Sequence, residues 1–267
     1  MTLPTASAPS DTAIAWCLLD AQGRELSSSA ADRPFYAAST IKLHVLLAAL
    51  RAADRGELDP DASVPATRTF TGEGGMPFTL AGDHLDPTHP DDGQQISVRD
   101  LLVRMIDRSS NEATDHVLSL VGLEAVASVI ADLELPATRV ERMIGDDAAL
   151  AAGRTNETSA RDLARTLDAI VRGGVALEAG SRDLAREALA AQRIRIIGRA
   201  VRPGVPVLSK SGWVDGFRHD VAAVGGGGAD EDRPLVLAVM TGGWDEAEAD
   251  ERILALTREL LPADLVR

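Results

Sequence analysis

Strand-like segments occur at both ends of this chain, and the segments between them have the periodicity of helices. Near the N-terminus, Thr12 to Asp20 is apolar and rich in β-forming residues, and Gly23 begins a turn into a second strand that ends at Ser29. Strand patterns return late in the chain, at Val205 to Ser209, His219 to Val224 and Pro234 to Met240. This pattern predicts an α+β fold, with one antiparallel sheet built from both chain termini, flanked by helices, and a helical lobe inserted between them.

Helical periodicity is clearest after Ser39, where leucines recur at helical spacing with few polar positions among them. This predicts a helix from about Ser39 to Asp54 that is buried on most sides. Two capping-box sequences predict helices that start near Val98 and near Ala160. Further helices are expected at Glu112 to Val121, Leu123 to Leu133 and about Asp245 to Leu261.

We expect a single domain over residues 1–267, with a sheet lobe at roughly 1–50 and 195–267 and a helical lobe at roughly 51–194. Between Pro60 and Gln95 the chain is rich in Gly, Pro, Asp and Thr, which predicts a long irregular surface connection. A polar loop containing Gly225 to Gly228 should join the last two strands. Hydrophobic residues make up 45% of the chain and charged residues 25%, which is the balance of a soluble globular protein.

The formal net charge of −14 excludes some partners, because such a surface repels phosphate backbones and anionic lipid. We therefore expect no nucleic acid and no membrane as partner. The single cysteine, Cys17, lies in an apolar run and is expected to be a small buried hydrophobe. The N-terminus carries no signal-like segment, which predicts a cytoplasmic protein, or a secreted one if the sequence was trimmed.

Lysine usage is the most informative feature for chemistry. Of 27 basic residues, only Lys42 and Lys210 are lysines. Arginine stays protonated and cannot act as a base, whereas a desolvated lysine can. Lys42 lies three residues after Ser39, so the two side chains should lie on one helix face, a turn apart. This spacing predicts a serine nucleophile beside an amine that can accept its proton.

Two further motifs accompany this pair. Lys210 is followed by Ser211 and Gly212 at the end of a predicted strand, where they can line one edge of a cleft. Ser109-Ser110-Asn111 is a polar cluster between two predicted helices, and taken alone it is an ordinary helix N-cap. Together the three motifs have the order and approximate spacing found in class A β-lactamases and penicillin-binding proteins. The sequence resembles that family over most of its length.

The resemblance implies an active-site serine hydrolase that opens a β-lactam, or a related amide or ester. Ser39 would be acylated, and Lys42 would accept its proton directly or through water. Ser109 would relay a proton to the leaving nitrogen, while Lys210 would hold this relay and the substrate carboxylate by charge. The resemblance further implies a small-molecule substrate, no metal, no cofactor and a monomeric protein.

Substrate-binding residues also follow from the resemblance. Asn111 would bind the side-chain amide of the substrate, and Ser211, followed by Gly212, its carboxylate. The backbone N–H groups of Ser39 and Trp213 would form the oxyanion hole. Arg218 lies where many family members keep a carboxylate-binding side chain, but its hairpin looks one residue shorter, and a surface arginine is an equal alternative.

The chain departs from the family pattern in two places. The middle motif has Ser110 where the family has aspartate, a position that supports the loop. In the loop from Thr138 to Ser159, Ile144 stands where a class A enzyme has the glutamate that activates the deacylating water. Asp146 and Asp147 follow closely and would act only if the loop were shifted. The alternative is that both aspartates are solvated or cap a helix.

These observations leave three functions open: a slow β-lactamase, a D,D-peptidase or esterase on the same scaffold, and a sensor that is acylated without turnover. Other chemistry is less well supported. The group formed by Asp83, His84, Asp86 and His89 is better explained as an acidic turn than as a metal site, and His44 as a core histidine. No Gly-x-Ser-x-Gly elbow occurs, which disfavours an α/β-hydrolase.

Overall fold

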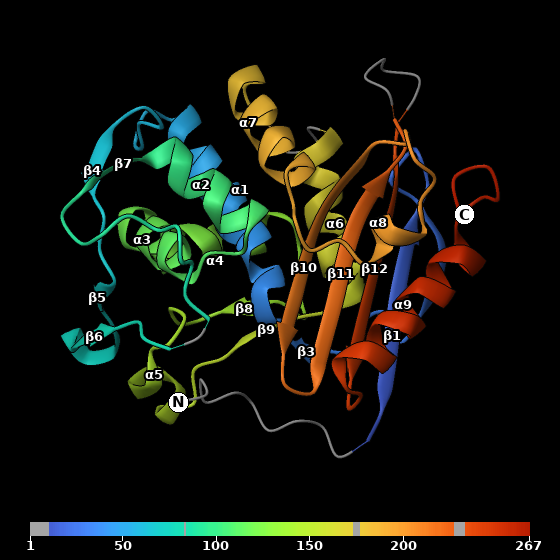
Figure 1. Cartoon of the computed structure of the whole chain (residues 1–267), viewed down its shortest axis with the longest axis horizontal. Helices are drawn as coiled ribbons and strands as arrows, with labels where there is room; N and C mark the ends of the chain where they lie inside the picture. Colours follow the sequence, from blue (N-terminus) through green and yellow to red (C-terminus); the bar gives the residue numbers. More distant parts are fainter. Residues whose placement is uncertain (1–10, 83, 173–176, 227–232) are drawn as a thin grey trace.

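The computed structural model describes residues 11–82, 84–172, 177–226 and 233–267, and its centre is a five-stranded antiparallel sheet (Figure 1). The strand order is β10-β11-β12-β1-β2. The strands span Val207–Val214, Phe217–Val224, Leu235–Gly242, Ala13–Leu19 and Glu25–Ser29 in that order. Strand β1 pairs along its whole length with β12, so both chain ends contribute to one sheet. The predicted α+β architecture is confirmed.

Helices cover both faces of this sheet. On one face, helix α6 (Ala160–Arg172) packs on β1 and β12, and helix α1 (Lys42–Asp54) packs on α6. A single hydrophobic core joins this face to the helical side of the molecule. The opposite face is covered by α8 (Ile197–Ala200) and α9 (Glu246–Leu260), with a second core between them and the sheet.

The helical side is built around α1, whose residues from Lys42 to Leu50 are all buried. Around it lie α2, α3, α4 and α7, which span Val98–Asp107, Asn111–Val121, Leu123–Asp132 and Ala179–Ala190. The predicted caps are present: the side chains of Ser97 and Ser159 accept hydrogen bonds from the backbone N–H groups of Asp100 and Asp162. Helix α7 was not predicted.

The connection expected to be irregular contains regular structure. Two small antiparallel pairs, β4 with β7 and β5 with β6, form within or beside it, so the prediction for residues 60–95 was too simple. These strands span Ser63–Pro65, Gln95–Ser97, Thr69–Thr71 and Pro77–Thr79. Each is three residues long, too short for periodicity to reveal from the sequence.

Another small sheet lies near the start of α1. It has the order β3-β9-β8, with strands Phe35–Tyr36, Asn156–Thr158 and Arg139–Val140. A short helix, α5 (Asp147–Ala151), lies between β8 and β9. This sheet therefore joins the ends of the loop that contains Ile144 to the segment just before Ser39.

Two predicted elements are corrected by the structure. Ser39 lies in a 3₁₀ turn, η1 (Ala38–Ile41), that precedes α1, so the α-helix starts three residues later than predicted. Strand β10 continues through Lys210, Ser211 and Gly212, because all three pair in register with β11.

Gly227, Gly228 and Asp83 lie outside the described residues. Among the described helices, no single one is long and apolar enough to cross a membrane, although α3 and α4 pass that test together, bent by 85°.

Close packing at the start of β1 predicts that Gly243→Ala destabilises the protein. Gly243 has φ +83°, and a Cβ there would lie 2.9 Å from the carbonyl oxygen of Asp11 and 3.0 Å from the Cα of Thr12. Gly204 is a matched control, since its φ is +88° but no atom lies within 4 Å of an added Cβ. Gly204→Ala should lower the free energy of unfolding only by the cost of placing alanine in the left-handed backbone region. Gly243→Ala should lose about 1–3 kcal/mol more in urea unfolding, and equal losses would contradict this packing argument.

Candidate active site

Ser39 lies where the helical side of the molecule meets the edge of the sheet. Turn η1 packs against β10, the edge strand, at Gly212. A Cβ at Gly212 would lie 3.1 Å from both the carbonyl oxygen of Ala37 and the backbone nitrogen of Thr40, so any larger residue would push η1 and β10 slightly apart. The Lys210-Ser211-Gly212 motif is thereby placed beside Ser39, which is itself only half-buried.

The two lysines meet at one hydroxyl group. Lys42 Nζ and Lys210 Nζ each lie 3.1 Å from Ser109 Oγ. Lys42 Nζ also donates to the carbonyl oxygen of Ser109 at 2.6 Å and to Asn111 Oδ1 at 2.8 Å. Lys210 Nζ donates to the carbonyl oxygen of Ser211 at 2.6 Å. The three sequence motifs therefore form one connected group.

Two residues at or beside the three motifs have an unusual backbone conformation. Ala38, just before Ser39, has φ 48°, and Ser109 has φ 59°. The left-handed region disfavours residues other than glycine, and such conformations occur preferentially at functional sites, where the surrounding structure holds them. Ala38 and Ser109 fit this pattern, because one precedes the predicted nucleophile and the other joins the two lysines.

Burial changes the acid–base properties of both lysines. Lys42 and Lys210 have no exposed surface. Burial, followed by the charge of Lys210, lowers the pKa of Lys42 well below its usual value, against the opposing effect of Asp115 and Glu112. Burial also lowers the pKa of Lys210 to about 7, and Asp220 opposes this shift. Lys42 is therefore suited to accept a proton near neutral pH.

Two buried carboxyl groups near the lysines were missed by the sequence analysis. Asp115 lies one helical turn after Asn111 on α3, and burial raises its pKa well above the usual value. Asp220 lies on β11 and accepts hydrogen bonds from the backbone N–H groups of Ile196 and Ile197 at 2.9 and 2.8 Å. Burial raises the pKa of Asp220 to about 6. Neither belongs to a motif, so only their burial identifies them.

The loop that carries Ile144 is fixed by polar contacts. The backbone N–H of Ile144 donates to Asp115 Oδ1 at 2.8 Å, which ties this position to α3. Arg142 donates to the hydroxyl of Tyr36 at 2.9 Å, and Asn156 accepts hydrogen bonds from the backbone N–H groups of Glu141 and Arg142. These contacts hold Ile144, the residue predicted to stand where class A enzymes have a glutamate.

The two aspartates after Ile144 have structural surroundings. Asp146 Oδ1 accepts a hydrogen bond from Ala149 N–H and caps α5, while Asp146 Oδ2 accepts one from Glu73 N–H, both at 2.9 Å. Asp147 is exposed in the first turn of α5. These contacts favour the capping interpretation for Asp146. Within the described residues, no hydrogen bond joins either aspartate to Lys42 or Lys210.

Four predicted substrate-binding residues, Ser211, Gly212, Trp213 and Arg218, lie on β10 and β11. Ser211 is buried, and Trp213, two residues further along the edge strand, has 48% of its surface exposed. Arg218 is paired with Trp213 across the strands, but its guanidinium group binds Asp250 at 2.7 Å and Glu246 at 3.0 Å on α9. The structure therefore does not bring Arg218 together with the lysine network, and its role in binding a substrate carboxylate stays a prediction.

His44 and His84 have different surroundings. His44 is fully buried, its Nε2 lies 3.1 Å from Thr166 Oγ1, and burial lowers its pKa to about 4, as expected for a neutral core histidine. His84 lies at the site, because its carbonyl oxygen accepts a hydrogen bond from Asn111 Nδ2 at 3.4 Å. Within the described ranges, no group of three or more potential ligands is arranged to hold a metal ion.

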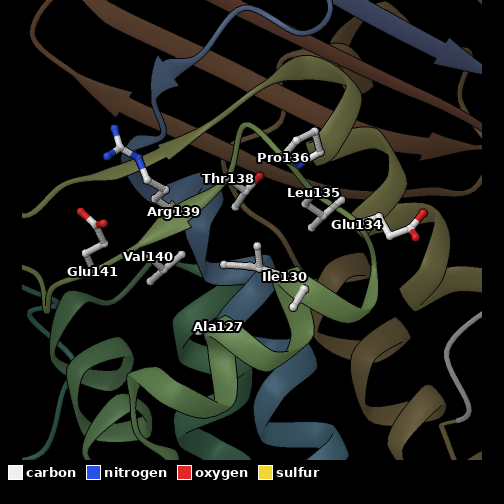
Figure 2. Close-up of a pocket in the computed structure, with 10 residues that line it drawn as sticks. Ala127, Ile130, Glu134, Leu135, Pro136, Thr138, Arg139, Val140 and Glu141 are labelled. Atoms are coloured by element: carbon white, nitrogen blue, oxygen red, sulfur yellow. The ribbon is translucent and has the colours of Figure 1, made fainter.

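Two hollows lie away from the catalytic motifs. One, of about 540 Å³, is lined mainly by apolar side chains of α4 and of the segment from Glu134 to Glu141, including Ile130, Leu135 and Val140 (Figure 2). The other, of about 610 Å³, lies between β5 and the junction of α3 with α4. None of the residues predicted to act on substrate lines either hollow.

A serine, two buried lysines and a second serine between them, at the junction of an antiparallel sheet and a helical lobe, define an active-site serine hydrolase scaffold of the β-lactamase and penicillin-binding type. The chain belongs to the beta-lactamase enzyme family, whose model matches residues 4–263. The comparison with curated proteins gave no match. The predicted family is confirmed.

Solved structures show the same fold. A beta-lactamase from Sphaerobacter thermophilus is 26% identical, with a TM-score of 0.78, over 95% of this chain and 92% of that one. A beta-lactamase from Xanthomonas campestris is 22% identical, with a TM-score of 0.77, over 92% of this chain and 90% of that one. PBP-A is 21% identical, with a TM-score of 0.74, over 94% of this chain and 89% of that one.

The surroundings of Asp115 predict how its substitution changes stability with pH. The pKa of Asp115 in the folded protein is raised above the unfolded value of 3.8. Its favourable contribution to the free energy of unfolding is therefore complete only below pH 3.8, and it is lost as pH rises through the folded-state pKa. Asp115→Asn keeps an oxygen for Ile144 N–H but carries no charge. Its free energy of unfolding relative to the wild type should increase from pH 4 to pH 8, measured by urea unfolding.

Two controls accompany this measurement. Asp115→Ala leaves the Ile144 N–H without its partner and should cost about 1–3 kcal/mol. Asp147→Asn removes an exposed carboxylate and is the matched surface substitution, measured over the same pH range. A constant difference between Asp115→Asn and the wild type across this pH range would show that Asp115 has an ordinary pKa.

Proposed function

We propose that this protein is an active-site serine hydrolase that opens β-lactams, or related amides and esters, through an acyl-enzyme on Ser39, and that it hydrolyses this ester slowly. The observation that carries the proposal is the shared contact of two buried lysines with Ser109 Oγ, in a structure where the turn that holds Ser39 packs against the strand that holds Lys210. A variant of PBP-A has been solved as an acyl-enzyme complex with penicillin G, which supports a β-lactam as the first probe.

Acylation is expected to use the lysine network. Neutral Lys42 takes the hydroxyl proton of Ser39, and Ser39 Oγ forms a bond to the carbonyl carbon of the substrate. The C–N bond of the substrate then breaks, and its nitrogen receives a proton from Ser109 Oγ. Ser109 is reprotonated by Lys42, whose Nζ lies 3.1 Å away. Lys42 thus returns to its neutral state when the acyl-enzyme is complete.

Substrate binding uses the edge of β10. Protonated Lys210 attracts the substrate carboxylate, and Ser211 and Gly212 provide the strand beside which the substrate lies. An edge strand leaves half of its backbone N–H groups unpaired, and these can bind an oxyanion together with the Ser39 N–H. Asn111 binds the side-chain amide of the substrate, and the exposed ring of Trp213 narrows the cleft.

Deacylation is the step for which this chain lacks a standard group. Ile144 cannot accept a proton, and Asp146 is occupied by the N–H groups of Ala149 and Glu73. Slow release of the acyl group favours a second candidate function, that of a D,D-peptidase-like or esterase-like hydrolase for which β-lactams act as long-lived acylating agents. The sensor function requires the same acylation and differs only in having no turnover.

A time course of intact protein mass with benzylpenicillin tests the proposal. The wild type should gain one benzylpenicilloyl group and keep it over many minutes, whereas Ser39→Ala should gain none. Ser29→Ala, on β2 at the far edge of the sheet, is the matched serine control and should behave as the wild type. An adduct on Ser39→Ala would refute Ser39 as the nucleophile. If the wild type gains no adduct, acylation by β-lactams is refuted.

A base placed at position 144 should accelerate release of the acyl group. Ile144→Glu is expected to shorten the lifetime of the adduct by about a hundredfold, because general base catalysis contributes roughly 10²- to 10⁴-fold. Ile144→Gln has the same size without a base and should leave the lifetime close to that of the wild type. Equal lifetimes for the two variants would show that another group already activates water in this protein.

A further inference from the structure

A buried glutamate joins the middle motif to the neighbouring loop. Glu112 immediately follows Asn111, in the first turn of α3, and has no exposed surface. Its carboxylate accepts hydrogen bonds from Asp86 N–H at 2.9 and 3.2 Å and from Ser110 Oγ at 3.1 Å. Arg68 Nε lies 4.0 Å away. A buried carboxylate with this many partners holds its surroundings rigidly, since each partner would otherwise be left unsatisfied.

The loop segment that Glu112 holds is well ordered by its own contacts. Asp86 Oδ1 accepts hydrogen bonds from the backbone N–H and the hydroxyl of Thr88, at 2.9 and 2.6 Å. Arg104 on α2 binds Asp86 Oδ2 at 3.2 Å and the carbonyl oxygen of Thr88 at 2.9 Å. Residues 84–89 therefore form a compact turn, and the bond from Asp86 N–H to Glu112 fixes this turn to the start of α3.

The same turn contacts the side chain that is proposed to bind substrate. Asn111 Nδ2 donates to the carbonyl oxygen of His84, and Asn111 Oδ1 accepts from Lys42 Nζ. The orientation of the Asn111 amide thus depends on both the lysine network and the turn. Displacing the turn would free one end of this amide and leave the contacts between the two lysines and Ser109 in place.

We propose that Glu112 is a positioning residue for recognition of the substrate's side-chain amide: it clamps the turn at residues 84–89, and the turn orients Asn111. This inference rests on the proposed function of Ser39. Ser110 occupies the motif position where the family has aspartate, and its hydroxyl caps α3 by accepting from Ala113 N–H at 3.1 Å. The carboxylate that supports the loop is provided two residues later, by Glu112.

The test compares acylation by two β-lactams that differ in this amide. Benzylpenicillin carries an acylamido side chain, whereas 6-aminopenicillanic acid carries a free amine at the same carbon. Glu112→Ala should lower the second-order rate constant of acylation by benzylpenicillin about tenfold, as for one lost hydrogen bond, and that by 6-aminopenicillanic acid less than about twofold. Glu112→Gln keeps an acceptor for Asp86 N–H and should restore the benzylpenicillin rate.

Glu124→Ala is the matched control, because Glu124 is also a first-turn glutamate, on α4, but is exposed. It should leave both rates unchanged. Equal losses with the two β-lactams in Glu112→Ala, or no loss with either, would overturn the positioning role while leaving Ser39 acylation intact. If neither β-lactam acylates the wild type, the proposed function fails, and the inference fails with it.

Discussion

The rest of the site depends on one constraint, the burial of two lysines against a single serine hydroxyl. Lys42 and Lys210 both contact Ser109 Oγ, although neither amine has exposed surface. Two ammonium groups at this distance would repel each other strongly in a medium of low dielectric constant. Burial lowers the pKa of both lysines, and the charge of Lys210 lowers that of Lys42 further. Burial, assisted by repulsion from Lys210, therefore makes Lys42 a base.

Nearby carboxyl groups limit how far this effect extends. Asp115 and Glu112 raise the pKa of Lys42, and Asp220 raises that of Lys210. Each of these groups also holds a segment of backbone: Asp115 binds Ile144, Glu112 binds Asp86, and Asp220 binds the start of α8. Electrostatic tuning and positioning are thus carried out by the same side chains. Asp115 Oδ2 and Asp220 Oδ1 are buried without a hydrogen-bond partner, which fits the raised pKa of both groups.

Much of the fold could be predicted because its signals are local. The capping serines at 97 and 159, the apolar alternation of β1 and the leucines of α1 are each visible within a short window of sequence. Helix α7 and the three-residue strands were not predicted, because their formation depends on neighbouring elements. The 3₁₀ turn at Ser39 was also missed. It is set by packing against Gly212, which lies on the last part of the chain.

The sequence by itself determined which chemical groups are present and in what order: a serine three residues before one lysine, a Ser-Ser-Asn cluster, an isoleucine at position 144, and a second lysine followed by Ser-Gly. Only the tertiary structure decided which of them meet. Ser109 is separated from Lys42 by 67 residues and from Lys210 by 101, and no local pattern specifies such contacts. It also decided that Arg218 binds α9, and that Glu112, Asp115 and Asp220 are buried, because burial and pairing arise only when distant segments pack together.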